Sequence, residues 1–105
     1  MPTTIDIQGI SRSRALRALV AEQLSQAFDG LRVPPLRARV IFTDENGPKG
    51  GDALRCAVTV KPPRAAVVHV EHLAATPRLA FDGALGKLER RLVRHREGVR
   101  AQRRR

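Results

Sequence analysis

Hydrophobic and polar residues follow two different periods along this chain. Four segments alternate residue by residue, which predicts strands that bury one face. They are residues 4–8, 36–43, 53–60 and 66–71. From Leu16 to Phe28, and again from Pro77 onward, apolar residues recur every three or four positions, which predicts two helices with one apolar stripe each. The predicted order of elements is therefore β-α-β-β-β-α.

The alternation also assigns the two faces of the sheet. Three consecutive strands after the first helix predict a meander, with the first strand added at its side. Its inward face is expected to hold Leu36, Ala38, Val40, Phe42, Leu54, Cys56, Val58 and Val60. Both helices have to cover this face, because their own apolar stripes need burial. We expect an α+β fold with a four-stranded sheet and two helices packed on one face.

Capping and breaking residues bound the elements. Ser11 or Ser13 is placed to cap the first helix, and Thr76 is placed to cap the second, whose first residue is Pro77. The segment DENGPKGGD, residues 44–52, is rich in glycine and charge and predicts a flexible connection between strands.

Composition adds a strong charge to this picture. The chain has 105 residues, 42% of them hydrophobic and 29% charged, which fits one soluble domain. Twenty Lys and Arg against ten Asp and Glu give a net charge of +10, and all but three of the basic residues are arginines. Such a balance favours a polyanionic partner, and arginine favours bidentate contacts with phosphate.

Most of this charge lies near the C-terminus. Residues 87–105 contain nine basic and two acidic residues. At helical spacing, Lys87, Arg90, Arg91 and Arg94 form one stripe beside the leucines at 85, 88 and 92. The outward strand positions Arg37, Arg39 and Arg55 are candidates to extend this surface. The alternative is that both sets are ordinary solvated surface.

The residues for several other chemistries are missing. Cys56 is the only cysteine, and the three histidines have no metal-ligand spacing, so no disulfide, metal, cofactor or catalytic site is expected. The chain has no Trp or Tyr on which splayed bases could stack. A signal-like leader and an apolar run of about 18 residues are also missing, so we expect a cytoplasmic protein that does not enter a membrane.

One motif resembles a known family. The second helix contains AFDGALGKLERRLVRHRE, in which Lys87-Leu88-Glu89-Arg90-Arg91-Leu92-Val93-Arg94-His95-Arg96 follows Ala80-Phe81-Asp82. This is similar to the ribosome hibernation-promoting factors, also described as ribosome-associated inhibitors or sigma-modulation proteins. The resemblance implies a fold like a double-stranded-RNA-binding domain. It also implies binding of small-subunit ribosomal RNA in the channel for messenger and transfer RNA, which silences idle ribosomes, with Lys87, Arg90, Arg91, Arg94 and Arg96 at the family's basic positions.

The resemblance is to the short form of the family. We expect a ribosome-binding domain over residues 1–97 and a basic tail over residues 98–105, with no second, dimerising domain and a monomer off the ribosome. Whether such a chain promotes or prevents ribosome pairing is open. Residues 75–78 read Ala-Thr-Pro-Arg where the family usually has Glu-Asp-x-Tyr, so an aromatic residue is lost.

Two other classes of protein are weighed against this hypothesis. The segment Pro48-Lys49-Gly50-Gly51-Asp52 resembles the Gly-Gly-Gln loop of release factors, but the glutamine that positions the attacking water is missing, so hydrolysis is not expected. A constitutive nucleic-acid-binding module, either a structural ribosomal component or a DNA-associated protein, would carry the same arginine stripe.

Overall fold

The computed structural model of the chain describes residues 3–9, 13–31, 34–44 and 54–103, and for residues 93–103 it describes the backbone alone. The expected flexible connection at residues 44–52 lies, apart from Asp44, outside the described residues.

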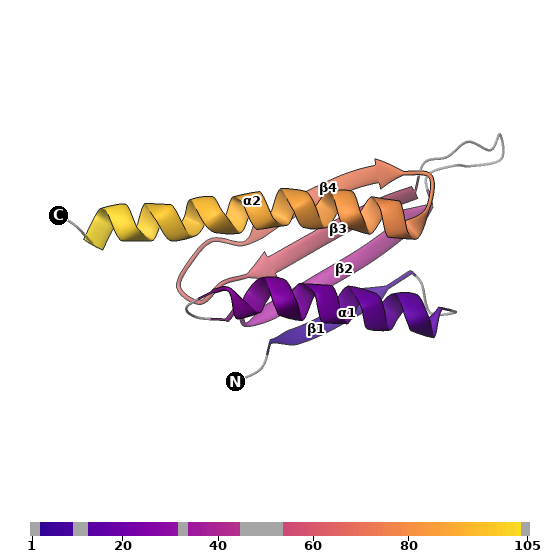
Figure 1. Cartoon of the computed structure of the whole chain (residues 1–105), viewed down its shortest axis with the longest axis horizontal. Coiled ribbons are helices and arrows are strands. Elements are labelled where there is room, and N and C mark those ends of the chain that lie inside the picture. Colours follow the sequence, from indigo (N-terminus) through magenta and orange to yellow (C-terminus); the bar gives the residue numbers. More distant parts are fainter. Residues whose placement is uncertain (1–2, 10–12, 32–33, 45–53, 104–105) are drawn as a thin grey trace.

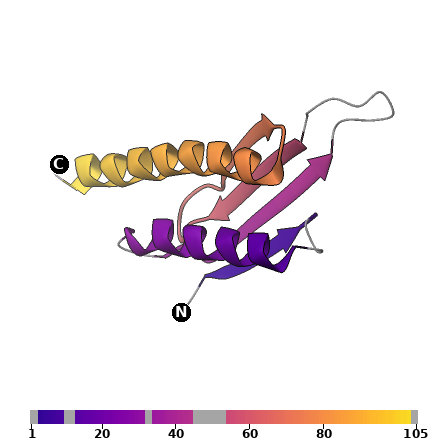
Figure 2. The same ribbon diagram turned by 45° about the vertical axis from the view of Figure 1, so that its right-hand side comes forward.

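The predicted order of elements is confirmed (Figure 1). The elements are β1 (Thr4–Gln8), α1 (Arg14–Asp29), β2 (Arg37–Asp44), β3 (Leu54–Lys61), β4 (Val68–Ala74) and α2 (Pro77–Arg103). The strands lie in the order β1-β2-β3-β4, with β1 parallel to β2 and the other neighbours antiparallel. Both helices cover the same face of this sheet (Figures 1 and 2).

Strand register builds the core in rows across the sheet. Val40 of β2 lies opposite Ile7 of β1 and Val58 of β3, and Val58 lies opposite Val70 of β4. The helices close the core from above with eight buried side chains. These are Val20, Leu24 and Phe28 from α1, and Ala80, Phe81, Ala84, Leu88 and Leu92 from α2. Since α2 buries residues from Ala80 to Leu92, this part of the helix is fixed against the sheet.

Both helices begin at side-chain caps. The Ser13 hydroxyl accepts a hydrogen bond from the Leu16 N–H at 3.2 Å, which decides between the two serines that the sequence offered. The Thr76 hydroxyl accepts one from the Leu79 N–H, also at 3.2 Å, and Pro77 is the first residue of α2. The helix continues to Arg103, so the backbone of residues 98–103 is helical.

Two expectations about the strands are wrong. Leu36 was expected in the core, but it lies one residue before β2 and is 58% exposed. The last strand runs from Val68 to Ala74 rather than over residues 66–71. Ala66 and Val67 belong to the turn after β3 and not to β4. Within this turn Arg64 adopts a positive φ of 59°.

Candidate nucleic-acid interface

Lys87, Arg90 and Arg91 form a basic flank of α2, and buried leucines hold the helix that carries it. Leu88 and Leu92 are buried against the sheet, and Leu85 is half-buried next to them. Lys87 and Arg91 each directly precede one of these buried leucines, and together with Arg90 they lie on the side of α2 that faces β4. Because the helix cannot rotate without exposing its leucines, these cations keep a fixed direction.

A shallow hollow of about 330 Å³ lies between this flank and β4. Its lining combines three cations of α2 with three residues of the strand, namely Lys87, Arg90, Arg91, His69, Val70 and Glu71. The strand β4 is the last of the sheet, so some of its backbone groups have no strand partner. The Lys87 ammonium donates to one of them, the carbonyl oxygen of Glu71, at 2.7 Å. Lys87 is therefore fixed in place at the rim of the hollow.

The two arginines of the hollow are exposed and available. Among the side chains that the structure describes, no carboxylate forms an ion pair with Arg90 or Arg91. Two neighbouring, unneutralised guanidinium groups on a rigid helix suit the spaced negative charges of a phosphate backbone. The side chains of Arg94 and Arg96 lie outside the described ones, although both positions belong to the helix.

The three sheet arginines differ in how far the chain's own carboxylates neutralise them. Arg39 pairs with Asp6 across 3.6 Å, and Arg55 pairs with Glu71 across 3.3 Å, so a carboxylate of the chain itself partly neutralises each. Arg37 is exposed and has no such partner among the described residues. The sequence predicted all three as equivalent, whereas the structure distinguishes Arg37 from the others.

Glu71 and His69 are the residues of the hollow that the sequence analysis missed. The Nε2 atom of His69 lies 2.8 Å from Oε2 of Glu71, and its Nδ1 atom lies 2.8 Å from the Thr59 hydroxyl. An ionised carboxylate only accepts, so Nε2 donates to it and a neutral ring accepts from Thr59 at Nδ1. The hydrogen bond from His69, followed by the charges of Arg55 and Lys87, lowers the pKa of Glu71. The period-two pattern already placed both residues outward on the last strand, but it does not show that this strand is the edge beside α2.

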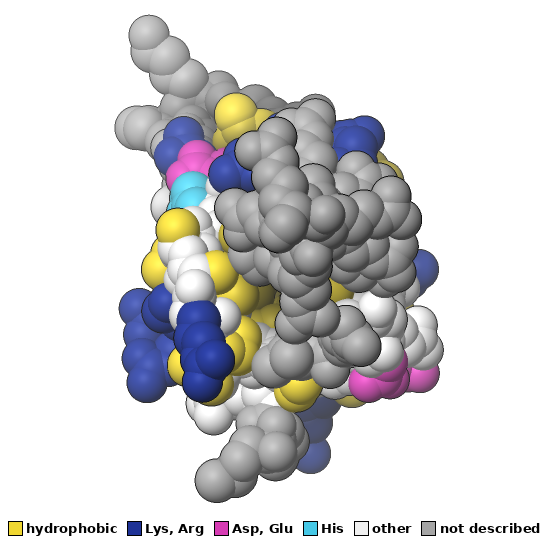
Figure 3. Space-filling view, turned by 90° about the vertical axis from the view of Figure 1, so that its left-hand side faces the viewer, with side chains coloured by type: hydrophobic (Ala, Val, Ile, Leu, Met, Phe, Trp, Pro, Cys, Tyr) yellow, Lys and Arg dark blue, Asp and Glu magenta, His cyan; other side chains and the backbone are white. Residues whose placement is uncertain are grey.

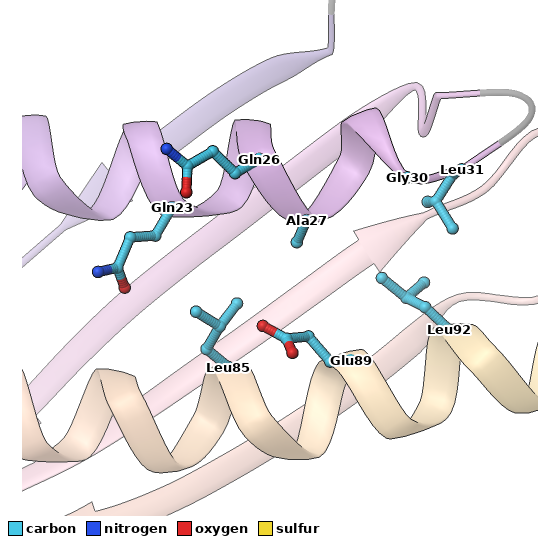
Figure 4. Close-up of a pocket in the computed structure, with 8 residues that line it drawn as sticks. All are labelled: Gln23, Gln26, Ala27, Gly30, Leu31, Leu85, Glu89 and Leu92. Carbon is cyan, nitrogen blue, oxygen red and sulfur yellow. The ribbon is translucent and has the colours of Figure 1, made fainter.

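A second hollow, of about 540 Å³, separates the two helices (Figure 4). From α1 it is lined by Gln23, Gln26 and Ala27, and from α2 by Leu85, Glu89 and Leu92. Figure 4 shows the Glu89 carboxylate on the α2 side, between the two leucines. A groove lined by a carboxylate and no cation does not suit phosphate, which leaves the β4 side of α2 as the candidate nucleic-acid interface.

The described residues give little support to a reactive thiol, a metal site or a membrane-spanning helix. Burial raises the pKa of the Cys56 thiol to about 12, which keeps it protonated and unreactive. No group of three or more His, Cys, Asp or Glu side chains in the described part of the chain could hold a metal ion. Within the same residues, no helix is long and apolar enough to cross a membrane.

Comparison with known proteins identifies relatives by fold and by sequence family. The N-terminal domain of Protein Y from Thermus thermophilus has the same fold, with a TM-score of 0.70 and 23% identity over 90% of this chain and 99% of that one. A ribosomal subunit interface protein from Coxiella burnetii matches with a TM-score of 0.65 and 20% identity over 92% of this chain and 99% of that one. No curated protein matches the chain. The profile of one family, described as sigma 54 modulation protein / S30EA ribosomal protein, matches residues 3–100. The chain belongs to this family.

Proposed function

We propose that this protein binds the small ribosomal subunit in the channel for messenger and transfer RNA and silences idle ribosomes in the cytoplasm. The family to which it belongs consists of ribosome-associated regulatory proteins and not of enzymes. The solved relative from Coxiella burnetii is described as a ribosomal subunit interface protein, which supports a ribosomal partner.

The single observation that carries the proposal is that Arg90 and Arg91, on a helix held by its buried leucines, form no ion pair with any carboxylate among the described side chains. Burial of Leu88 and Leu92 holds the helix, and the hydrogen bond from Lys87 to the Glu71 carbonyl holds the rim of the hollow. Ribosomal RNA would then approach the β4 side of α2 with its phosphates toward these cations. Arg94 and Arg96 would continue the contact along the helix.

Recognition through phosphates explains how the protein inhibits without catalysis. The 27 residues of α2 form a rod of about 40 Å at 1.5 Å per residue. Bound along the RNA backbone, such a rod occupies space that messenger or transfer RNA needs. Inhibition would therefore be steric, reversible and weakened by salt.

The test removes three positive charges from the hollow. The variant K87Q/R90Q/R91Q is compared with R14Q/R17Q/R78Q, which removes the same charge from exposed positions on α1 and the first turn of α2. We expect the first variant to lose roughly 10- to 100-fold in affinity for purified small subunits at 100 mM KCl, because three phosphate contacts are lost. It should also lose inhibition of cell-free translation, whereas the control variant stays close to wild type.

Two results would contradict the proposal. One is equal binding by the hollow variant and the control, with circular dichroism confirming that both are folded. The other is a lysate in which the protein sediments only with DNA, or at a fixed stoichiometry with every ribosome in all growth phases. That result would identify the constitutive nucleic-acid-binding module instead.

A further inference from the structure

A second group of cations lies at the end of the sheet where β3 turns into β4. Arg37 at the start of β2 lies directly opposite Lys61 at the end of β3. Directly opposed residues on one face have neighbouring side chains, and two like charges in this arrangement repel each other. A polyanionic partner would relieve this repulsion.

The turn adds a third cation to this pair. The Lys61 ammonium donates to the carbonyl oxygen of Ala65, which brings it over the turn that contains Arg64. Arg64 is exposed and has a positive φ of 59°, the left-handed region that glycine adopts without cost. Strained backbone conformations are concentrated at functional sites, so a charged and exposed residue in this conformation is a candidate for binding.

The carboxylates of the outward sheet face are engaged elsewhere. Asp6 pairs with Arg39, and Glu71 pairs with Arg55 and His69. Among the described residues, no carboxylate forms an ion pair with Arg37, Lys61 or Arg64. Figure 3 looks onto this end of the molecule and shows Lys and Arg side chains gathered at its lower left. It also shows acidic and histidine side chains together at the upper left, apart from that group.

We propose that Arg37, Lys61 and Arg64 form a second phosphate-binding site, which contacts the RNA backbone independently of α2. The proposal rests on the proposed function for the identity of the partner. This site lies on the outward face of the sheet at the turn between β3 and β4, whereas the arginines of the other lie on α2, which covers the opposite face (Figure 1). A flat anionic membrane touches one side of a molecule, whereas RNA that surrounds the protein reaches both.

The main test compares two variants of equal charge. R37Q/K61Q/R64Q and the control R14Q/R17Q/R78Q each remove three positive charges. Affinity for purified small subunits is measured with fluorescently labelled full chain between 50 and 300 mM KCl. We expect the sheet variant to bind roughly 10-fold more weakly at 100 mM KCl, and the slope of log affinity against log salt to fall by roughly 2 units.

The single variant R64G separates binding from folding. Glycine relieves the strain at a φ of 59°, so thermal unfolding is expected at the same or a higher temperature than in the wild type. Affinity for the small subunit is expected to fall nonetheless, because the guanidinium group is lost. A merely structural role for Arg64 predicts the opposite pairing, with altered stability and unchanged affinity.

The outcomes distinguish the two proposals. If K87Q/R90Q/R91Q loses affinity while R37Q/K61Q/R64Q behaves like the control, the second site is refuted and the proposed function stands. If neither variant differs from the control, both proposals fail. If the sheet variant loses binding to anionic phospholipid vesicles but not to small subunits, the site belongs to a membrane and the proposal is refuted.

Discussion

Glu71 connects the outward face of the sheet with the basic flank of α2. Its carboxylate contacts His69 and Arg55, while its backbone carbonyl holds Lys87. Its pKa is lowered chiefly by the hydrogen bond from His69. A carboxylate whose pKa is lower in the folded than in the unfolded protein stabilises the fold at pH values above its unfolded pKa. That stabilisation is lost as the pH falls through the folded pKa.

The substitution E71Q tests this linkage at one residue. We expect E71Q to be less stable than the wild type at pH 7, and the difference to shrink as the pH falls below the ordinary glutamate value of 4.5. Urea unfolding at pH values from 7 to 2.5 measures this difference. The control E89Q changes an exposed glutamate of α2 and should show no comparable dependence. A stability difference for E71Q that stays constant over this range would contradict the interpretation.

At the scale of the element, two glycines of α2 differ in what surrounds them. A Cβ atom at Gly83 would lie 2.1 Å from Cδ2 of His72 on β4, so this glycine allows the helix to approach the strand. A Cβ atom at Gly86 would meet nothing within 4 Å. Glycine inside a helix is less favourable than alanine by roughly 0.5–1 kcal/mol. Only the first glycine therefore has a packing reason to be there.

Alanine substitutions at these two positions should have opposite effects. We expect G86A to stabilise the protein by about 0.5–1 kcal/mol through helix propensity. G83A should destabilise it by about 1–3 kcal/mol, because the His72 ring has to move. Chemical denaturation measures both values, and the two variants serve as controls for each other. A change of the same sign and size at both positions would contradict the predicted contact between α2 and β4.

At the scale of the whole molecule, the excess of positive charge acts on the free and the bound protein in opposite ways. The net charge is +10, with twenty Lys and Arg against ten Asp and Glu, so the cations exceed what the chain's own carboxylates such as Asp6 and Glu71 can pair. Repulsion between the remaining cations destabilises the free fold, and an RNA partner would relieve it. The same charges drive binding, since each phosphate contact releases counterions.

Salt should therefore stabilise the free protein and weaken its complex. Between 20 and 500 mM KCl we expect the thermal unfolding temperature of the free protein to rise, because screening reduces repulsion. Over the same range the affinity for small subunits should fall steeply. Circular dichroism melts and equilibrium binding measure the two trends. An unfolding temperature that falls with KCl would contradict this account of the charge.

The sequence by itself determined the order of the elements, the cap at Thr76 and most of the inward face of the sheet, and it predicted the basic stripe of α2. Each depends on residues close together in the chain, such as Thr76 and Leu79 at a helix start, so periodicity and capping rules suffice. The motif in α2 indicated the family, and the match over residues 3–100 shows it.

Only the tertiary structure decided which cations are free. The sequence places Arg37, Arg39 and Arg55 alike at outward strand positions. In the structure Asp6 pairs with Arg39 and Glu71 pairs with Arg55, each from a neighbouring strand that lies far away in the chain. Strand register likewise placed Lys61 opposite Arg37, and the edge position of β4 brought Glu71 to Lys87. Such pairings depend on which strands become neighbours, and a side-chain period of two cannot encode that choice.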